Sequence, residues 1–318
     1  MSRILTLDIA KGIGIILVVV GHCINAYTIP GIFIYAFHMP LFFFISGICF
    51  NGEKNKRFLP FVYKRFLQLI IPAVLFSAII ISVSFFLLDK DIYLSNISWI
   101  GFPHAIWFLG ILFIVEITYW GIYKSSKSST NIIIFILLGF LIGAWTSSQK
   151  LCYPYSIFTS FSALAFYALG NLLQPLILKF SKQKKHSILF IIAGVGAILV
   201  ECIFCIKTGH VISMVTNNFV LTDLFSACFG IFAIICISKS IELFFVLGMQ
   251  NIFIWLGHNT LGIMCSHILL INISNKLIEP LISNHLLYKL TESLFVWIVV
   301  IVLSIFINHN CRWLVGKR

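Results

Sequence analysis

The sequence predicts an all-α integral membrane protein, a polytopic bundle of about ten transmembrane helices. Three observations support this: 60% of the 318 residues are hydrophobic, only 10% are charged, and the apolar residues gather in long runs. Soluble domains average about 25% charged residues, so most soluble classes are excluded, as are disordered and fibrous proteins. At about 20 residues per span plus connections, the length allows roughly ten spans and leaves no room for a sizeable soluble domain.

The apolar runs define the expected spans. They lie near residues 9–28, 32–50, 67–88, 104–123, 131–148, 158–178, 187–206, 219–238, 257–275 and 290–309. A further apolar stretch near 241–256 is interpreted as an interfacial or re-entrant helix. The first run carries Asp8 and Lys11 and lacks a small-residue cleavage site, so we expect a retained span. No repeat or low-complexity linker divides the chain, which predicts one membrane domain over residues 1–318.

The net charge of +12 is better explained by orientation in a membrane than by nucleic-acid binding, because the basic residues lie between apolar stretches. Of the 22 Lys and Arg residues, Lys11 lies within the first span and sixteen, Lys239 among them, lie in one set of connections. The alternate set carries the remaining five: Lys90, Lys150, Lys207, Lys276 and Lys289. Loops rich in Lys and Arg stay in the cytoplasm, so we expect both termini there.

The nine cysteines do not predict a disulfide framework, because most lie inside apolar runs. Cys202 and Cys205 form a C-x-x-C pair on an apolar helix without a partner pair, and small filler residues are the favoured interpretation. No His, Cys and carboxylate cluster has zinc-ligand spacing, and no phosphate-cradling glycine loop or nucleic-acid-binding stripe appears. We therefore expect no metal and no nucleic-acid partner.

The first span carries ionisable residues, which are costly in lipid and mark candidate sites. Lys11 and His22 are eleven positions apart, close to three helical turns, and Asp8 and Asn25 extend the same face, which also holds Gly14. This polar stripe should face the bundle interior or a wet cavity. The alternative is that Lys11 extends to the headgroups and His22 is a satisfied core histidine.

Five segments combine polar and aromatic residues in a specific order. They are Leu7-Asp8-x-x-Lys11-Gly12 with Gly21-His22, Phe37-His38-Met39-Pro40 through Gly47, Arg65-Phe66 leading to Pro72, Ile106-Trp107-Phe108-Leu109, and Gly257-His258-Asn259 with His267. Together they resemble the membrane acyltransferase family 3, nearest to the fucose 4-O-acetyltransferase-like and other stand-alone sugar O-acetyltransferases. Lys11 stands where many members carry arginine, and Gln68 stands where many carry a second arginine.

The resemblance implies an O-acyltransferase of the bacterial cytoplasmic membrane. It would move an acetyl group from cytoplasmic acetyl-CoA to a hydroxyl of an envelope glycan or lipid-linked sugar, alongside glycan-assembly proteins. Histidine suits proton abstraction near neutral pH, so His22 is the candidate general base, and Lys11 and Asp8, on the same helix face, are the further catalytic candidates. The donor would be bound by Lys11, Lys64, Arg65 and Trp107, with Arg65 gripping phosphate in a bidentate manner. For the basic loop as a whole, membrane orientation is the competing explanation.

Further buried polar residues are candidates for binding the acceptor sugar. His38 should reach a depth similar to that of His22, and it could orient His22, contact the sugar or pack beside Pro40. Glu116 roughly shares a helix face with Trp107. Two other ionisable residues in spans, Glu201 and His267, complete the candidate set: His38, Glu116, Glu201 and His267.

A transporter or flippase is the competing function, supported by ten spans, internal charges and the re-entrant stretch. Against it, the sequence lacks paired spans broken by Gly or Pro in two related halves, the usual sign of alternating access. A purely structural subunit poorly explains so many buried ionisable groups. The stripe from Lys11 to His22 favours the enzyme.

Overall fold

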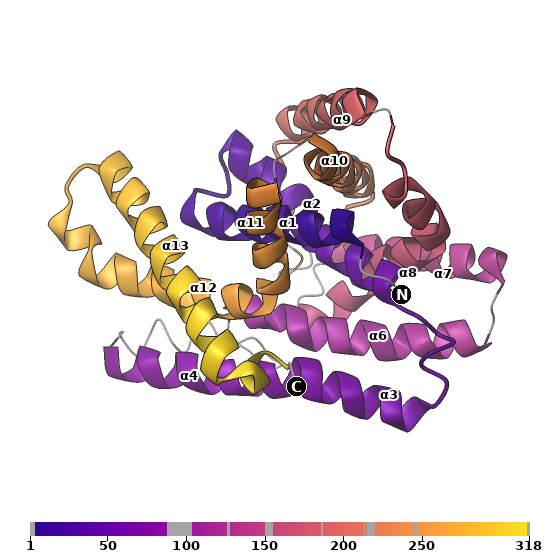
Figure 1. The fold of residues 1–318 in the computed structure, drawn as a ribbon, viewed down its shortest axis with the longest axis horizontal. Helices are drawn as coiled ribbons and strands as arrows, with labels where there is room; N and C mark the ends of the chain where they lie inside the picture. Colours follow the sequence, from indigo (N-terminus) through magenta and orange to yellow (C-terminus); the bar gives the residue numbers. More distant parts are fainter. Residues whose placement is uncertain are drawn as a thin grey trace.

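A computed structural model describes residues 4–87, 104–125, 128–149, 155–185, 187–212, 214, 220–244 and 247–316. Its helices, shown in Figure 1, are α1 (Leu5–Cys23), α2 (Ile29–Cys49), α3 (Phe58–Arg65), α4 (Ile71–Leu87), α6 (Trp107–Ser125), α7 (Ser129–Ser148), α8 (Tyr155–Ser181), α9 (Ser187–Thr208), α10 (Asp223–Phe244), α11 (Leu247–His258), α12 (Thr260–Leu277) and α13 (His285–Asn310). Arg3, Lys90, Lys127, Lys150, Lys317 and Arg318, which enter the orientation argument, lie outside the described residues.

The prediction of an all-α protein with ten spans is confirmed. Within the described ranges, ten helices are long and apolar enough to cross a membrane, counting Phe58–Leu87 as one span. That third span begins nine residues before the predicted start. The stretch near 241–256 contains α11, a separate helix of 12 residues. At about 1.5 Å per residue, α11 is too short to cross a hydrocarbon core of about 30 Å.

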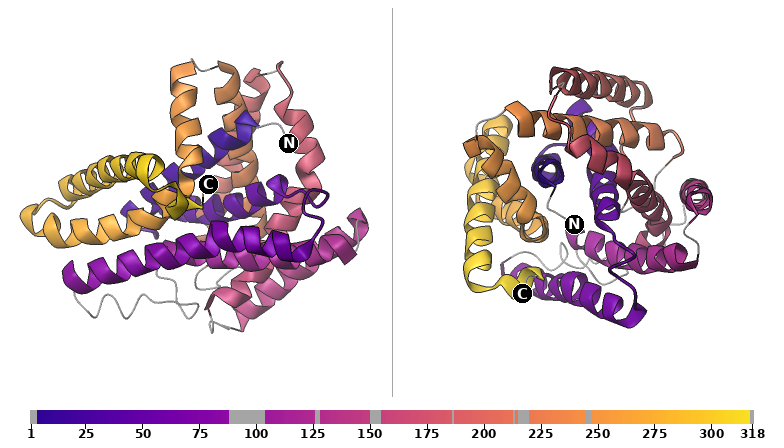
Figure 2. Two further views of the ribbon diagram at one scale, coloured as in Figure 1. Left: turned by 60° about the horizontal axis from the view of Figure 1, so that its bottom comes forward. Right: turned by 45° about the vertical axis from the view of Figure 1, so that its right-hand side comes forward.

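Helix α1 lies inside the bundle. It packs against α2, α10, α11 and α12, and the apolar core surrounds it. Figures 1 and 2 show α12 and α13 side by side on one flank, while α9 lies against α10 and α3–α4 runs beside α6. The face of α1 that carries the ionisable residues therefore meets other helices.

Two helix crossings bring backbones into direct contact through glycine. A Cβ built on Gly47 of α2 would lie 1.9 Å from the carbonyl oxygen of Tyr167 in α8, and one on Gly170 would lie 2.0 Å from that of Phe44. The α1–α11 crossing repeats the arrangement with Gly12 and Gly257. Small residues allow such approach in membrane bundles, where dispersion contacts drive association. These crossings fix α2 and α11 relative to the helices that carry the candidate site.

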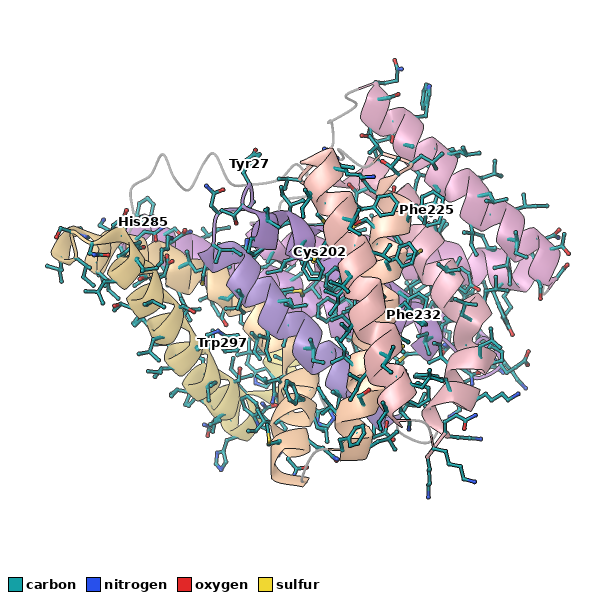
Figure 3. All side chains as sticks on the ribbon, turned by 90° about the horizontal axis from the view of Figure 1, so that it is seen from above. Tyr27, Cys202, Phe225, Phe232, His285 and Trp297 are labelled. Carbon is teal, nitrogen blue, oxygen red and sulfur yellow. The ribbon has the colours of Figure 1, made fainter. Side chains whose placement is uncertain are left out.

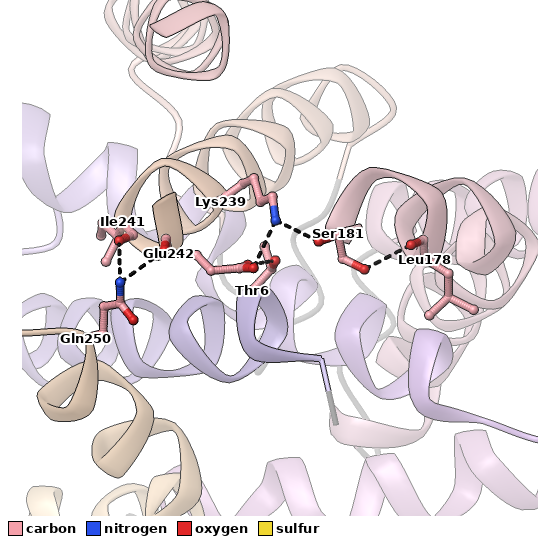
Figure 4. Close-up of polar contacts among 7 residues, drawn as sticks. All are labelled: Thr6, Leu178, Ser181, Lys239, Ile241, Glu242 and Gln250. Atoms are coloured by element: carbon pink, nitrogen blue, oxygen red, sulfur yellow. Dashed lines mark hydrogen bonds and ion pairs between the residues drawn. The ribbon is translucent and has the colours of Figure 1, made fainter. Parts of the chain in front are cut away.

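A buried polar cluster joins several helix ends (Figure 4). Glu242 of α10 accepts a hydrogen bond from Thr6 of α1 and pairs with Lys239 Nζ at 2.9 Å. Lys239 Nζ also donates to the carbonyl of Ser181 at 2.6 Å. The beginning of α1 and the ends of α8 and α10 therefore lie together, as the alternation of basic connections predicts.

The assignment of Lys239 to a solvated loop is wrong. Lys239 lies within α10 and is only 1% exposed. Glu242 and the Ser181 carbonyl accept hydrogen bonds from its ammonium group, which offsets the cost of burying the charge. One of the sixteen basic residues in the orientation argument is thus a structural ion-pair partner.

The outer surface is rich in apolar side chains. Figure 3 shows the side chains around α9, α10 and α13, with Phe225, Phe232 and Trp297 labelled. Phe225 and Phe232 are both more than half exposed. Exposed apolar side chains of this kind fit helices whose solvent is lipid.

Candidate active site

A polar cavity of about 220 Å³ lies beside the first turns of α1. Its polar lining comes from α1, α2, α3, α6, α8 and the connection between α2 and α3: Lys11, Ser46, Cys49, Asn55, Lys64, Arg65, Glu116 and Tyr167. Three of these side chains are cationic and one is a carboxylate, so the lining carries two positive charges in excess. Such a cavity suits an anionic ligand.

Arg65 is held in a fixed orientation on the cavity wall. Its Nε and Nη2 atoms donate to the two carboxylate oxygens of Glu116, which is 1% exposed, and its Nη1 donates to Gln68 Oε1 at 2.8 Å. A bidentate pair fixes the plane of the guanidinium group as well as its position. The sequence predicted that the Arg65 guanidinium group binds phosphate, and in this structure that group is paired with Glu116.

A π-helical turn at Phe66–Ile70 joins α3 to α4 next to Arg65. The N–H of Ile71 donates to the carbonyl of Phe66. Pro72 explains the wider turn, because proline has no N–H for the carbonyl four residues earlier and its ring would clash there. π-Helical turns are frequent at functional sites. Here the turn carries Gln68 and follows Arg65 directly.

Asp8 links the cavity wall to the end of α11. Its Oδ1 lies 3.4 Å from Lys11 Nζ, and its Oδ2 lies 3.4 Å from Nε2 of His258, the last residue of α11. The α1–α11 glycine crossing holds these elements together. Asp8 thus orients Lys11 towards the cavity and places a histidine beside it.

A second cluster gathers imidazole and phenol groups from α1, α2 and α12. Tyr35 OH lies 3.1 Å from His22 Nδ1, and the Tyr35 ring packs edge-on against His38 at a centroid distance of 5.0 Å. The rings of His22 and His267 are 5.1 Å apart. His22, Tyr35, His38 and His267 form what we call the histidine cluster.

The protonation of two cluster histidines follows from their partners. His38 Nδ1 lies 2.8 Å from the carbonyl of Ile34, and His267 Nδ1 lies 3.1 Å from that of Ile263. A carbonyl only accepts, so each Nδ1 carries a proton, and a neutral ring then has its lone pair on Nε2. His22 differs, because its Nδ1 faces a hydroxyl that can donate or accept.

The structure brings most candidate residues into two groups. Lys11, Lys64, Arg65 and Glu116 line the cavity, whereas His22, His38 and His267 belong to the histidine cluster. Glu116, expected near the acceptor sugar, therefore lies with the candidate donor residues. Each group includes a residue of α1, so this helix connects the two.

Trp107 and Glu201 lie in neither group. Trp107 is buried at the start of α6 and packs edge-on against Phe108. Glu201 is fully buried in α9, its carboxyl group lies close to Gly230 and Phe37, and neither oxygen has a hydrogen bond among the described residues.

The expectation that Asn25 extends the stripe along α1 is wrong. Helix α1 ends at Cys23, and Asn25 Oδ1 accepts the N–H of Tyr27 at 2.9 Å in the turn before α2. Asparagine competes with helix in this way by bonding nearby backbone groups.

Sequence reasoning did not select Tyr35, Cys49 or Tyr167. Tyr35 precedes His38 by three residues, so the two share a helix face, and that spacing is a usable signal. Tyr167 reaches the cavity only through the close α2–α8 crossing, for which the sequence carries no comparable signal.

Comparison with known proteins places this architecture. A family model described as "Acyltransferase domain" matches residues 4–308. The bundle with its two polar groups is thus that of an integral membrane acyltransferase. The chain belongs to this acyltransferase family, as its motifs predict.

One curated relative covers a short segment. The nodulation protein NolL of Mesorhizobium japonicum is 38% identical over 90 residues, which is 25% of this chain and 24% of that protein. The chain therefore matches about a quarter of the length of this relative. No solved structure matches.

Proposed function

We propose that this acyltransferase moves an acetyl group from acetyl-CoA to a hydroxyl of an envelope glycan or lipid-linked sugar, with His22 as general base. The supporting observation is that α1 contributes Lys11 to the cationic cavity and His22 to the histidine cluster. The two lie eleven residues apart, about 16 Å along the axis at ~1.5 Å per residue. A pantetheine arm is long enough for such an offset.

The cavity is the proposed donor site. CoA carries phosphates, and the cavity has three cationic side chains, of which Arg65 is paired with Glu116, Lys11 lies beside Asp8, and Lys64 is in excess. Because CoA is made in the cytoplasm, the cavity and both termini would face that side. This orientation agrees with the distribution of basic connections. The membrane would be a bacterial cytoplasmic membrane.

The histidine cluster is the proposed reaction site. When the Tyr35 oxygen accepts the Nδ1 proton of His22, the lone pair of that ring lies on Nε2. Nε2 takes the proton of the acceptor hydroxyl, the hydroxyl oxygen bonds to the thioester carbonyl carbon, and the carbon–sulfur bond breaks. The CoA thiolate leaves and takes the proton from His22 Nε2, which restores the neutral imidazole. His267 lies next to His22, and His38 lies next to Tyr35, so both could bind further hydroxyl groups of the acceptor.

Substitution of His22 tests the assignment. Cells lacking the gene would be complemented with wild type, His22→Ala, Tyr35→Phe or His309→Ala, and O-acetyl groups on surface glycans would be measured by mass spectrometry. His309, an exposed residue at the end of α13, is the matched control. We expect His22→Ala to lower the O-acetylation of surface glycans at least about 100-fold, because general base catalysis usually contributes a factor of this size. Full acetylation by a normally expressed His22→Ala protein would reject the assignment.

A further inference from the structure

A second cavity, of about 420 Å³, lies beside the first. It is formed by α3, the π-helical turn and the C-terminal turn Arg312–Val315. We call it the aromatic groove and define it by Tyr63, Lys64, Leu67, Gln68, Trp313 and Gly316. Lys64 lines both cavities, so its side chain forms a wall that the groove shares with the cationic cavity.

Two aromatic side chains remain open on the groove. Tyr63 is 63% exposed and Trp313 is 58% exposed. Trp313 is nevertheless held in place by its backbone. Gly316 has φ 65°, and a Cβ there would lie 2.8 Å from Gln68 Cα, so the C-terminal turn packs directly on the π-helical turn. The groove thus exposes the rings of Tyr63 and Trp313, and the backbone segments that carry them pack against each other.

Gln68 adds a polar contact to the groove. Its Oε1 accepts from Arg65 Nη1, which leaves the amide nitrogen as the donor for a ligand in the groove. A planar heterocycle with a ring-nitrogen acceptor complements an amide donor between aromatic side chains. Lys64 at the shared wall would meet an anionic group attached to that heterocycle.

The aromatic groove differs from a third groove, which lies between α1, α11 and α13. That groove has a volume of about 500 Å³ and a lining of apolar residues, Ile16, Trp255 and Trp297 among them, with Asn251 as its polar member. Acyl chains of bulk lipid fit such a surface. The aromatic groove also has apolar walls, from Leu67 and Ile71, but Lys64 and Gln68 add an ammonium group and an amide, which suit a base linked to phosphate better than an acyl chain.

We propose that the aromatic groove binds the adenine end of the CoA donor, with the base stacked on Trp313 or Tyr63 and the phosphates directed past Lys64 into the cationic cavity. This inference rests on the proposed donor and adds a site that recognises its nucleobase. Stacking on an aromatic side chain strengthens base binding by about 5- to 100-fold.

Binding by the full-length protein in nanodiscs tests the proposal. Equilibrium affinities for CoA and for 4′-phosphopantetheine, which lacks the adenosine, its 3′-phosphate and one of the two bridging phosphates, would be measured for wild type, Trp313→Ala, Trp313→Phe, Tyr63→Ala and Trp145→Ala. Trp145 is 59% exposed on α7 and is the matched control. We expect Trp313→Ala to weaken CoA binding about 5- to 100-fold and to leave 4′-phosphopantetheine unchanged. Trp313→Phe should retain most of the affinity.

Each other outcome has a defined meaning. An unchanged CoA affinity in both Trp313→Ala and Tyr63→Ala would overturn the proposal. So would an equal loss for both ligands, which would mean that Trp313 only supports the fold. If Trp313→Ala lowers CoA affinity only in nanodiscs that contain anionic lipid, the groove would be assigned to a lipid headgroup and the proposal would be rejected. Wild type that binds both ligands equally well would reject the groove site and keep the donor, whereas wild type that binds neither would reject the donor and the groove together.

Discussion

The backbone contact between α2 and α8 controls how closely these helices pack, and Gly47→Ala tests it. A Cβ at Gly47 would lie 1.9 Å from the Tyr167 carbonyl oxygen, whereas real Cβ contacts stay beyond 3.0 Å. The helices must therefore separate by roughly 1 Å. Asn171, whose Nδ2 donates to the Gly47 carbonyl at 3.2 Å, would lose that hydrogen bond.

The expected loss of stability follows from three contributions. Overpacking costs about 1–3 kcal/mol, the lost hydrogen bond costs about 1 kcal/mol, and the higher helix propensity of alanine returns about 0.5–1 kcal/mol. The net destabilisation is about 1–3.5 kcal/mol. Because Tyr167 also lines the cationic cavity, CoA affinity should fall as well.

Thermal unfolding of the purified protein in detergent, followed by intrinsic fluorescence at a fixed scan rate, measures the effect. Gly196→Ala in α9 is the control, since nothing lies within 4 Å of a Cβ built there. The control should melt at the wild-type temperature or slightly above it, and Gly47→Ala should melt several degrees lower. Equal melting temperatures for the two variants would refute the reasoning.

Two buried charged residues give further predictions in the same melting assay. Glu116→Gln should destabilise the protein by about 2–4 kcal/mol, because Arg65 keeps its charge and loses its carboxylate partner, and Arg65→Leu combined with Glu116→Leu should recover most of that loss. A double variant no more stable than Glu116→Gln would contradict the pairing. Glu201→Leu should leave stability unchanged or raise it, because its carboxyl oxygens are unpartnered among the described residues. Destabilisation by Glu201→Leu of more than about 1 kcal/mol would show that the carboxyl group has a partner.

The fold could be predicted because membrane spans are marked by long apolar runs, but their ends are set by local hydrogen bonds. The predicted first span continued to residue 28, whereas α1 ends at Cys23. Asn25 bonds to the backbone of Tyr27, and Thr28 caps α2 by accepting the N–H of Gly31 at 3.3 Å. Asparagine followed by a Thr cap was a readable signal that the apolar pattern obscured.

The candidate site was only partly predictable for a different reason. Spacing along one helix relates Lys11 to His22, since both lie on α1. The partner of Arg65 is Glu116, 51 residues away on α6, and no periodicity within a single helix connects them. Their pairing depends on how α3 and α6 meet beside the π-helical turn. Glu116, expected to bind the sugar, is thus the counter-charge of Arg65 in the wall of the cationic cavity.

The position of α1 explains how one helix can serve both proposed half-sites. At its beginning the polar face borders the cavity that Lys11 shares with Lys64 and Arg65. At its end the same face meets α2 and α12, where His22 contacts Tyr35 and His267. A rigid helix keeps the two groups at a constant separation, and the Gly12–Gly257 contact anchors its first half against α11. Acyl transfer between ligands that enter from opposite ends requires such a fixed distance, because the thioester must stop within reach of the base.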